Sequence, residues 1–86
     1  MEEKDIYDTL IKLIHDYVPE LTDKPLAMET VINTETNIDS MGFVLIISKL
    51  EGIYDIKISD RQMRKFITIA DVVRFVKGKV DAKATA

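Results

Sequence analysis

The apolar run over residues 41–50 constrains the fold of this chain more than any other feature of the sequence. Residues 43–47 are all apolar and follow one another without interruption. A buried strand is compatible with this run, because β-branched residues are enriched in strands. We prefer a helix, since the pattern continues to residue 54 without a turn signal before Asp55, and strands of that length are less usual.

The segment before this run divides into a helix and a long connection. Residues 5–18 place apolar side chains at helical spacing. Pro19 ends this helix, because the residue before a proline avoids the helical region. Residues 19–37 hold both prolines and only scattered apolar residues, so we predict a long first loop that packs as a structured segment.

Two helix starts follow the apolar run. Ser59 and Gln62 have the spacing of a capping box, which predicts a short helix to residue 66. Thr68 with Asp71 predicts the start of a last helix, because an acidic residue is favoured in a first turn. We expect this helix to end at Gly78, a residue type common after helix ends.

Size and composition then set the fold class. The chain has 86 residues, of which 47% are hydrophobic, as expected of one small globular domain. We predict an all-α fold: a four-helix bundle with a long first loop and a short third helix. The single domain is expected to span residues 1–80, and residues 81–86 are expected to form a flexible C-terminal tail.

Several classes of function are disfavoured by what the sequence lacks. There is no cysteine, which excludes disulfides, thiolate metal sites and cysteine nucleophiles. The acids are not spaced as in a calcium-binding loop, so no metal site is expected. No apolar run approaches the roughly 20 residues of a membrane span. We expect no membrane insertion, no signal peptide and a cytoplasmic, monomeric protein.

Charge is distributed unevenly along the chain. Residues 1–60 carry 13 acids and 5 bases, whereas residues 61–86 carry 2 acids and 7 bases. The basic third is either a solvated surface or a surface for docking a partner. A small helical nucleic-acid binder is disfavoured, because the net charge is −3 and no groove-reading motif is recognised.

Asp39-Ser40-Met41 stands where the polar stretch 33–37 gives way to the apolar run. A serine in the first turn of a helix is a favourable attachment point for a phosphodiester, since helix N-termini attract negative charge. It is a poor nucleophile here, because no histidine or lysine neighbours it in sequence to take its proton. Ser40 is therefore either a modification site or a simple helix cap.

These residues belong to a spaced set: Asn37-Ile38-Asp39-Ser40-Met41, Leu50-Glu51, Tyr54-Asp55-Ile56-Lys57-Ile58 and Thr68-Ile69. Together they resemble the acyl carrier protein family. In that family Asp-Ser-Leu or Asp-Ser-Met opens the second helix, and a Leu-Glu pair follows in the same helix. An aromatic residue, an Ile-x-Ile-type segment and a Thr-Val or Thr-Ile pair come next. The resemblance is close over residues 37–76 and generic over 5–18.

The resemblance implies a carrier that is not itself an enzyme. Ser40 would carry 4′-phosphopantetheine, transferred from coenzyme A by a phosphopantetheinyl transferase, and Asp39 would assist recognition by that transferase. The thiol of the arm would hold acyl groups as thioesters for acyl-transferring or condensing enzymes of fatty-acid, polyketide or related lipid and secondary-metabolite synthesis. An alternative is a carrier-fold interaction module that is not modified and binds its partner independently of Ser40.

The chain departs from the family pattern at two places. Thr36-Asn37 stand where the family usually has Leu-Gly. The family's second helix is typically acidic, but here Glu51 is the acid that remains among positions otherwise held by Gly42, Leu45, Gly52 and Ile53. Two interpretations stay open for this apolar helix. Either Phe43 and Leu45 are partly exposed in a docking patch, or they fold under the first loop.

Two sets of candidate residues follow. Partner docking is assigned to Met41, Phe43, Leu45 and Glu51. A tethered acyl chain could be lined by Val44, Ile47, Met63 and Ile67, since methionine adapts to such cavities. Ordinary core packing explains the lining residues equally well.

Overall fold

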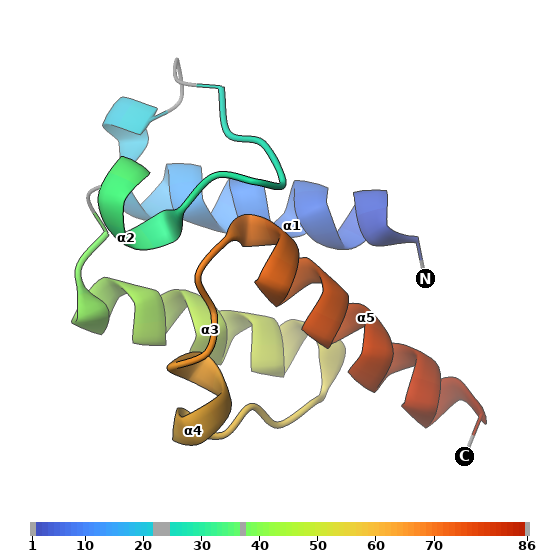
Figure 1. The fold of residues 1–86 in the computed structure, drawn as a ribbon. Coiled ribbons are helices and arrows are strands. Elements are labelled where there is room, and N and C mark those ends of the chain that lie inside the picture. The colour runs from blue at the N-terminus through green and yellow to red at the C-terminus, as the bar shows by residue number, and fades with distance from the viewer. Residues whose placement is uncertain (1, 22–24, 37, 86) are drawn as a thin grey trace.

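The computed structural model describes residues 2–21, 25–36 and 38–85. Three long helices form the body of the molecule: α1 (Glu3–Tyr17), α3 (Ser40–Tyr54) and α5 (Ile69–Thr85) (Figure 1). Shorter elements lie in the connections: the 3₁₀ turn η1 (Pro19–Leu21), α2 (Ile32–Glu35) and α4 (Asp60–Met63). The described residues contain no strand, so the all-α prediction is confirmed, with η1 and α2 as additions to the four expected helices.

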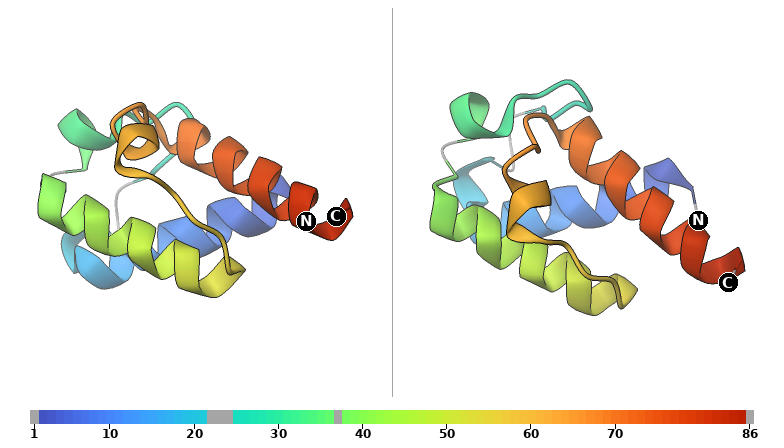
Figure 2. Two further views of the ribbon diagram at one scale, coloured as in Figure 1. Left: turned by 90° about the horizontal axis from the view of Figure 1, so that it is seen from below. Right: turned by 60° about the horizontal axis from the view of Figure 1, so that its bottom comes forward.

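The arrangement of the long helices places one end of the molecule apart from the chain termini. α1 and α3 run in opposite directions, and α1 packs against both α3 and α5. α2, the start of α3 and α4 gather at the end opposite the two chain ends (Figure 2). The short elements therefore surround the first turn of α3.

Each long helix contributes one buried stripe to a common core. Residues spaced three and four apart lie on the same face of a helix, which is the spacing of the buried positions here. The innermost side chains are at most 2% exposed: Ile6, Leu10 and Ile14 on α1, Ile46, Ile47 and Leu50 on α3, and Ile69, Val72, Val73 and Val76 on α5. Burying each such side chain contributes roughly 1.5–3 kcal/mol, and this burial holds the three helices together.

The first loop is fixed to the connection between α4 and α5. Val31 and Thr68 form an antiparallel bridge. The Ile32 N–H donates to the Ile67 carbonyl at 2.9 Å, and the Ile69 N–H donates to the Thr30 carbonyl at 3.1 Å. The loop is therefore structured over its described residues, and it holds α2 close to the start of α3.

Thr36 anchors the end of this loop by hydrogen bonds. Its side chain is fully buried, and its hydroxyl donates to the Ile32 carbonyl and accepts the Ile38 N–H at 3.4 Å. A buried polar group that is satisfied in this way costs little. Thr36 therefore holds this end of the loop by hydrogen bonds at the position where the family pattern has an apolar leucine, and Asn37 lies outside the described residues.

The expected end of the last helix at Gly78 is wrong. α5 continues to Thr85, although a glycine inside a helix costs about 1 kcal/mol relative to alanine. Two contacts favour the extra turns. Lys77 pairs with Asp81 at 2.7 Å, and Lys83 Nζ donates to the Asp55 carbonyl at 2.8 Å. The predicted tail 81–86 is thus helical through residue 85, while its flexibility stays a prediction.

Candidate functional site

Asp39, and not Ser40, caps α3. The backbone of Asp39 is extended, with φ −78° and ψ 175°, and its Oδ1 accepts the Gly42 N–H at 2.7 Å. Ser40 is the first helical residue, and its side chain is exposed. Its hydroxyl has no hydrogen-bond partner among the described residues. The interpretation of Ser40 as a simple cap is therefore wrong.

The first turn of α3 also provides backbone donors. A helix leaves its first N–H groups without intrahelical acceptors. Asp39 satisfies one of them, because its side chain accepts from Gly42, while its carbonyl accepts the first intrahelical bond from Phe43 at 2.9 Å. The N–H groups of Ser40 and Met41 have no acceptor among the described residues, and an anion on the Ser40 oxygen would lie beside them.

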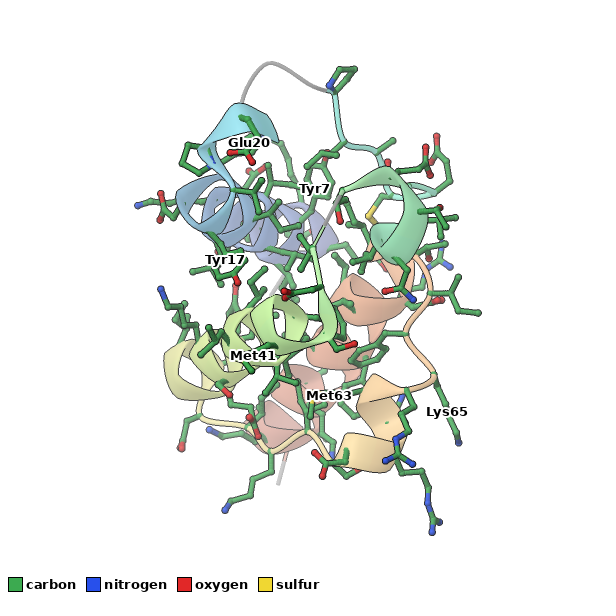
Figure 3. All side chains as sticks on the ribbon, turned by 90° about the vertical axis from the view of Figure 1, so that its left-hand side faces the viewer. Tyr7, Tyr17, Glu20, Met41, Met63 and Lys65 are labelled. Atoms are coloured by element: carbon green, nitrogen blue, oxygen red, sulfur yellow. The ribbon has the colours of Figure 1, made fainter. Side chains whose placement is uncertain are left out.

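Ser40 stands on the wall of a groove of about 420 Å³. Its lining comes from α2, α3, α4 and the segment after α4: Asn33, Ser40, Phe43, Val44, Asp60, Met63, Arg64 and Phe66. The rings of Phe43 and Phe66 meet edge-on with 6.3 Å between their centroids. Figure 3 looks onto this end of the molecule, with Met41 and Met63 labelled. The groove joins an apolar interior to the exposed serine.

The groove gathers part of the predicted acyl-chain lining. Val44 and Met63 lie on its walls. Ile47 is fully buried in the core between the helices, and Ile67 is 57% exposed and is not part of the groove. Phe43 and Phe66 extend the lining beyond the predicted set. The role of these residues toward an acyl chain stays a prediction.

The predicted docking residues separate into outward and inward side chains. Met41 is 74% exposed and Leu45 is 49% exposed. Phe43 is partly buried and faces Phe66. Because Leu45 is half exposed, the interpretation that both Phe43 and Leu45 fold under the first loop is wrong for Leu45. Glu51 uses its carboxylate within the chain, since its Oε2 accepts the Ile58 N–H at 2.9 Å.

Gly42 has a packing role that the sequence did not reveal. A Cβ at this position would lie 2.5 Å from Cε2 of Tyr17, so the ring at the end of α1 rests directly on the first turn of α3. From the sequence alone, Gly42 stands at a position that is often acidic in the family pattern. A side chain here would have to displace the Tyr17 ring, and a glycine in the first turn of an apolar helix is the signal that indicates such a contact.

Arg64 is the second residue that the sequence did not single out. It lines the groove together with Ser40 and Val44. The excess of bases after residue 60 was the signal in the sequence, but it did not indicate which base lies near the serine.

The groove lining bears on whether Ser40 could act as a nucleophile itself. The lining includes Asp60 and Arg64 but no histidine or lysine that would deprotonate the hydroxyl. Within the described residues, no cluster of histidines and acids could hold a metal ion. In the same part of the chain, no helix combines the length and apolar character of a membrane span.

Models of known protein families gave no match to this chain.

Proposed function

We propose that this chain is a carrier protein that holds acyl groups as thioesters on a 4′-phosphopantetheine arm attached to Ser40. It would deliver them to partner enzymes of fatty-acid, polyketide or related lipid and secondary-metabolite synthesis. One observation carries the proposal: Ser40 is exposed, and its hydroxyl has no hydrogen-bond partner among the described residues, at a helix start that Asp39 already caps. The spaced motifs that resemble acyl carrier proteins supply the identity of the group.

The residues around Ser40 fit a phosphodiester. The N–H groups of Ser40 and Met41 would face its negative charge, and the dipole of α3 would favour it. Asp39 holds the first turn through Gly42, so the hydroxyl stays available to a transferase. The arm would bring the thiol that a chain without cysteine lacks.

The groove gives the arm or a short acyl chain an apolar surface beside its attachment point. Phe43, Val44 and Met63 supply apolar walls, and about 420 Å³ lies between them and the rest of the lining. The acyl transfer itself would belong to partner enzymes, because the lining of the groove includes no histidine, lysine or cysteine.

A second function is favoured by the exposed apolar residues of α3. A carrier-fold module without an arm would bind a partner through Met41 and Leu45, which are 74% and 49% exposed. Such a complex would form equally well with Ser40→Ala. The two functions therefore differ in their dependence on one oxygen.

Intact-mass spectrometry tests the carrier proposal. The purified chain is incubated with coenzyme A and a broad-specificity phosphopantetheinyl transferase. We expect the mass of one phosphopantetheinyl group to be added to the wild type and to Ser48→Ala, and none to Ser40→Ala. Ser48 is the matched control, because it is an exposed serine on the same helix. An unmodified wild type would reject the carrier function.

A further inference from the structure

The outer face of α3 is apolar and almost without charge. Its exposed large apolar residues are Met41, Val44, Leu45 and Ile53, which are between 45% and 74% exposed. Val44 and Leu45 lie three and four residues after Met41, and Ile53 lies eight residues after Leu45, which places all four on one side of the helix. The other exposed positions between them are Ser48, Lys49 and Gly52. We call these four apolar residues the apolar face of α3.

Three cations lie close together in sequence after the start of α4, and one of them, Arg64, lines the groove together with Val44 of this face. Arg61, Arg64 and Lys65 lie on α4 and the turn after it, and all three are exposed. None of them forms an ion pair or a side-chain hydrogen bond with another described residue. We call them the basic edge. In Figure 3 the labels run across the view from Met41 through Met63 to Lys65.

The apolar face and the basic edge meet at the groove that contains Ser40. Val44 from the apolar face and Arg64 from the basic edge both line this groove. Tyr17 continues the apolar surface on the opposite side of α3, where its ring rests on Gly42 and is itself 44% exposed. The surface around the serine thus has an apolar centre and cations along one border, and Asp39 and Asp60 are exposed beside the serine.

We propose that the apolar face of α3 and the basic edge form one docking surface for a protein that presents an apolar ridge bordered by acidic side chains. Cations that pair with no described residue and lie next to an apolar centre favour a partner of opposite charge, since complementary charges guide the encounter of two proteins and fix their orientation. This inference deepens the proposed function, because a partner docked here would lie over Ser40. It is nevertheless tested without the arm.

The charge pattern favours a protein over an anionic membrane. Asp39 and Asp60 are exposed beside Ser40, and Asp60 shares the groove with Arg64. A uniformly anionic surface would approach these carboxylates together with the cations. A folded partner can place each of its charges separately. A second copy is also less suited, because the same surface on a second copy presents cations along its border and not the acidic side chains that complement the basic edge.

Two labelled helical peptides test this partner chemistry on the unmodified Ser40→Ala chain. Both peptides carry the same leucine stripe, which is flanked by glutamates in one peptide and by lysines in the other. Fluorescence anisotropy measures their affinities at low and physiological salt. We expect the glutamate peptide to bind about tenfold more tightly, with a preference that shrinks as salt rises. Amide shifts of the chain should change on α3 and α4.

Matched variants locate the interaction. Arg64→Glu should abolish the preference for the glutamate peptide, and Leu45→Ser should weaken the binding of both peptides. Lys12→Glu, which changes an exposed cation on α1, should leave both affinities unchanged. Circular dichroism of each variant separates loss of binding from loss of fold.

Three results would overturn the proposal. The first is equal affinity for the two peptides, or shift changes confined to α1. The second is a chain that binds both peptides equally but binds phosphatidylglycerol vesicles, with the vesicle binding lost in Arg64→Glu. The third is a dimer in sedimentation that Leu45→Ser dissociates. If the peptides fail to bind as expected but Ser40 of the wild type is modified normally, the docking proposal is rejected and the carrier function is retained.

Discussion

α3 and α5 begin with similar residues used in opposite ways. At α5 the Thr68 hydroxyl accepts the Asp71 N–H at 3.2 Å, and Asp71 Oδ2 accepts the N–H groups of Ile67 and Thr68 at 2.9 and 3.0 Å. At α3 the aspartate comes first, so Asp39 caps the helix and the following Ser40 hydroxyl has no partner among the described residues.

The order of the acid and the hydroxyl residue decides what each helix start can do. When the hydroxyl residue comes before the helix and the acid three positions later, the two side chains satisfy the backbone reciprocally. When the acid is the cap, the next side chain is free. The side chains at the start of α5 are therefore committed to the helix, whereas the start of α3 leaves the Ser40 hydroxyl without a partner among the described residues.

The largest expected effect is the difference between Ser40 and Thr68 as acceptors of phosphopantetheine. Ser40→Ala should lose all transfer of phosphopantetheine from coenzyme A, because the accepting oxygen is gone. Thr68→Ala should be modified at the wild-type rate, since Thr68 is committed to its own helix. The initial rate of label incorporation from a fluorescent coenzyme A measures both. Normal labelling of Ser40→Ala would break the comparison.

Stability should show the reverse order. Thr68→Ala and Asp39→Ala should each lower the free energy of unfolding by about 1 kcal/mol, because each removes a side-chain cap. Ser40→Ala should change the free energy of unfolding by less than about 0.5 kcal/mol, since the exposed hydroxyl has no hydrogen-bond partner among the described residues. Urea unfolding followed by circular dichroism gives these values. A loss at Ser40 that equals the loss at Asp39 would mean that the serine shares in the capping.

A smaller effect concerns the close approach at Gly42. Alanine here favours the helix but meets the Tyr17 ring, whose Cε2 lies 2.5 Å from the added Cβ. We expect Gly42→Ala to destabilise the wild type by no more than about 1 kcal/mol, because the partly exposed ring can swing away.

The same substitution in a Tyr17→Ala background should stabilise the chain, since the ring is absent and the propensity gain of up to about 1 kcal/mol remains. The double-mutant cycle, measured by urea unfolding, gives the coupling directly. Equal effects of Gly42→Ala in both backgrounds would show that the ring does not rest on this turn in solution.

The smallest expected effect concerns the free energy of unfolding at acidic pH. The N–H groups of Thr68 and Ile67 stabilise the charged carboxylate and hold the pKa of Asp71 below its ordinary value of 3.8. Its stabilising contribution is therefore complete above that ordinary value and is lost as the pH falls through the lowered pKa. Asp71→Asn should lose less unfolding free energy than the wild type between about pH 4 and pH 2. A steeper loss in Asp71→Asn would contradict the hydrogen bonds at the start of α5.

The helices that carry strong local patterns were predictable from the sequence. The stripe on α1 and the capping pairs at Ser59 and Thr68 depend on residues three or four positions apart, which a sequence displays directly. Ser59 Oγ indeed accepts the Gln62 N–H at 3.1 Å. The end of α5 was not predictable from Gly78, because the contact of Lys83 with Asp55 joins residues 28 positions apart.

The candidate site was predictable at its serine and less so around it. Ser40 stood out because a polar stretch met an apolar run. The groove, however, depends on tertiary contacts that bring Arg64 and Phe66 beside Val44. The role of Thr36 was missed for a similar reason, since a buried hydroxyl with two hydrogen bonds resembles an exposed loop threonine in sequence.

Fragment mass spectrometry of the modified wild-type chain tests the central claim most directly. The account predicts that the whole phosphopantetheinyl mass resides on Ser40, with none on Ser48 or on Ser59, which caps α4. A group found on another hydroxyl, or a wild type that takes up no group at all, would contradict it.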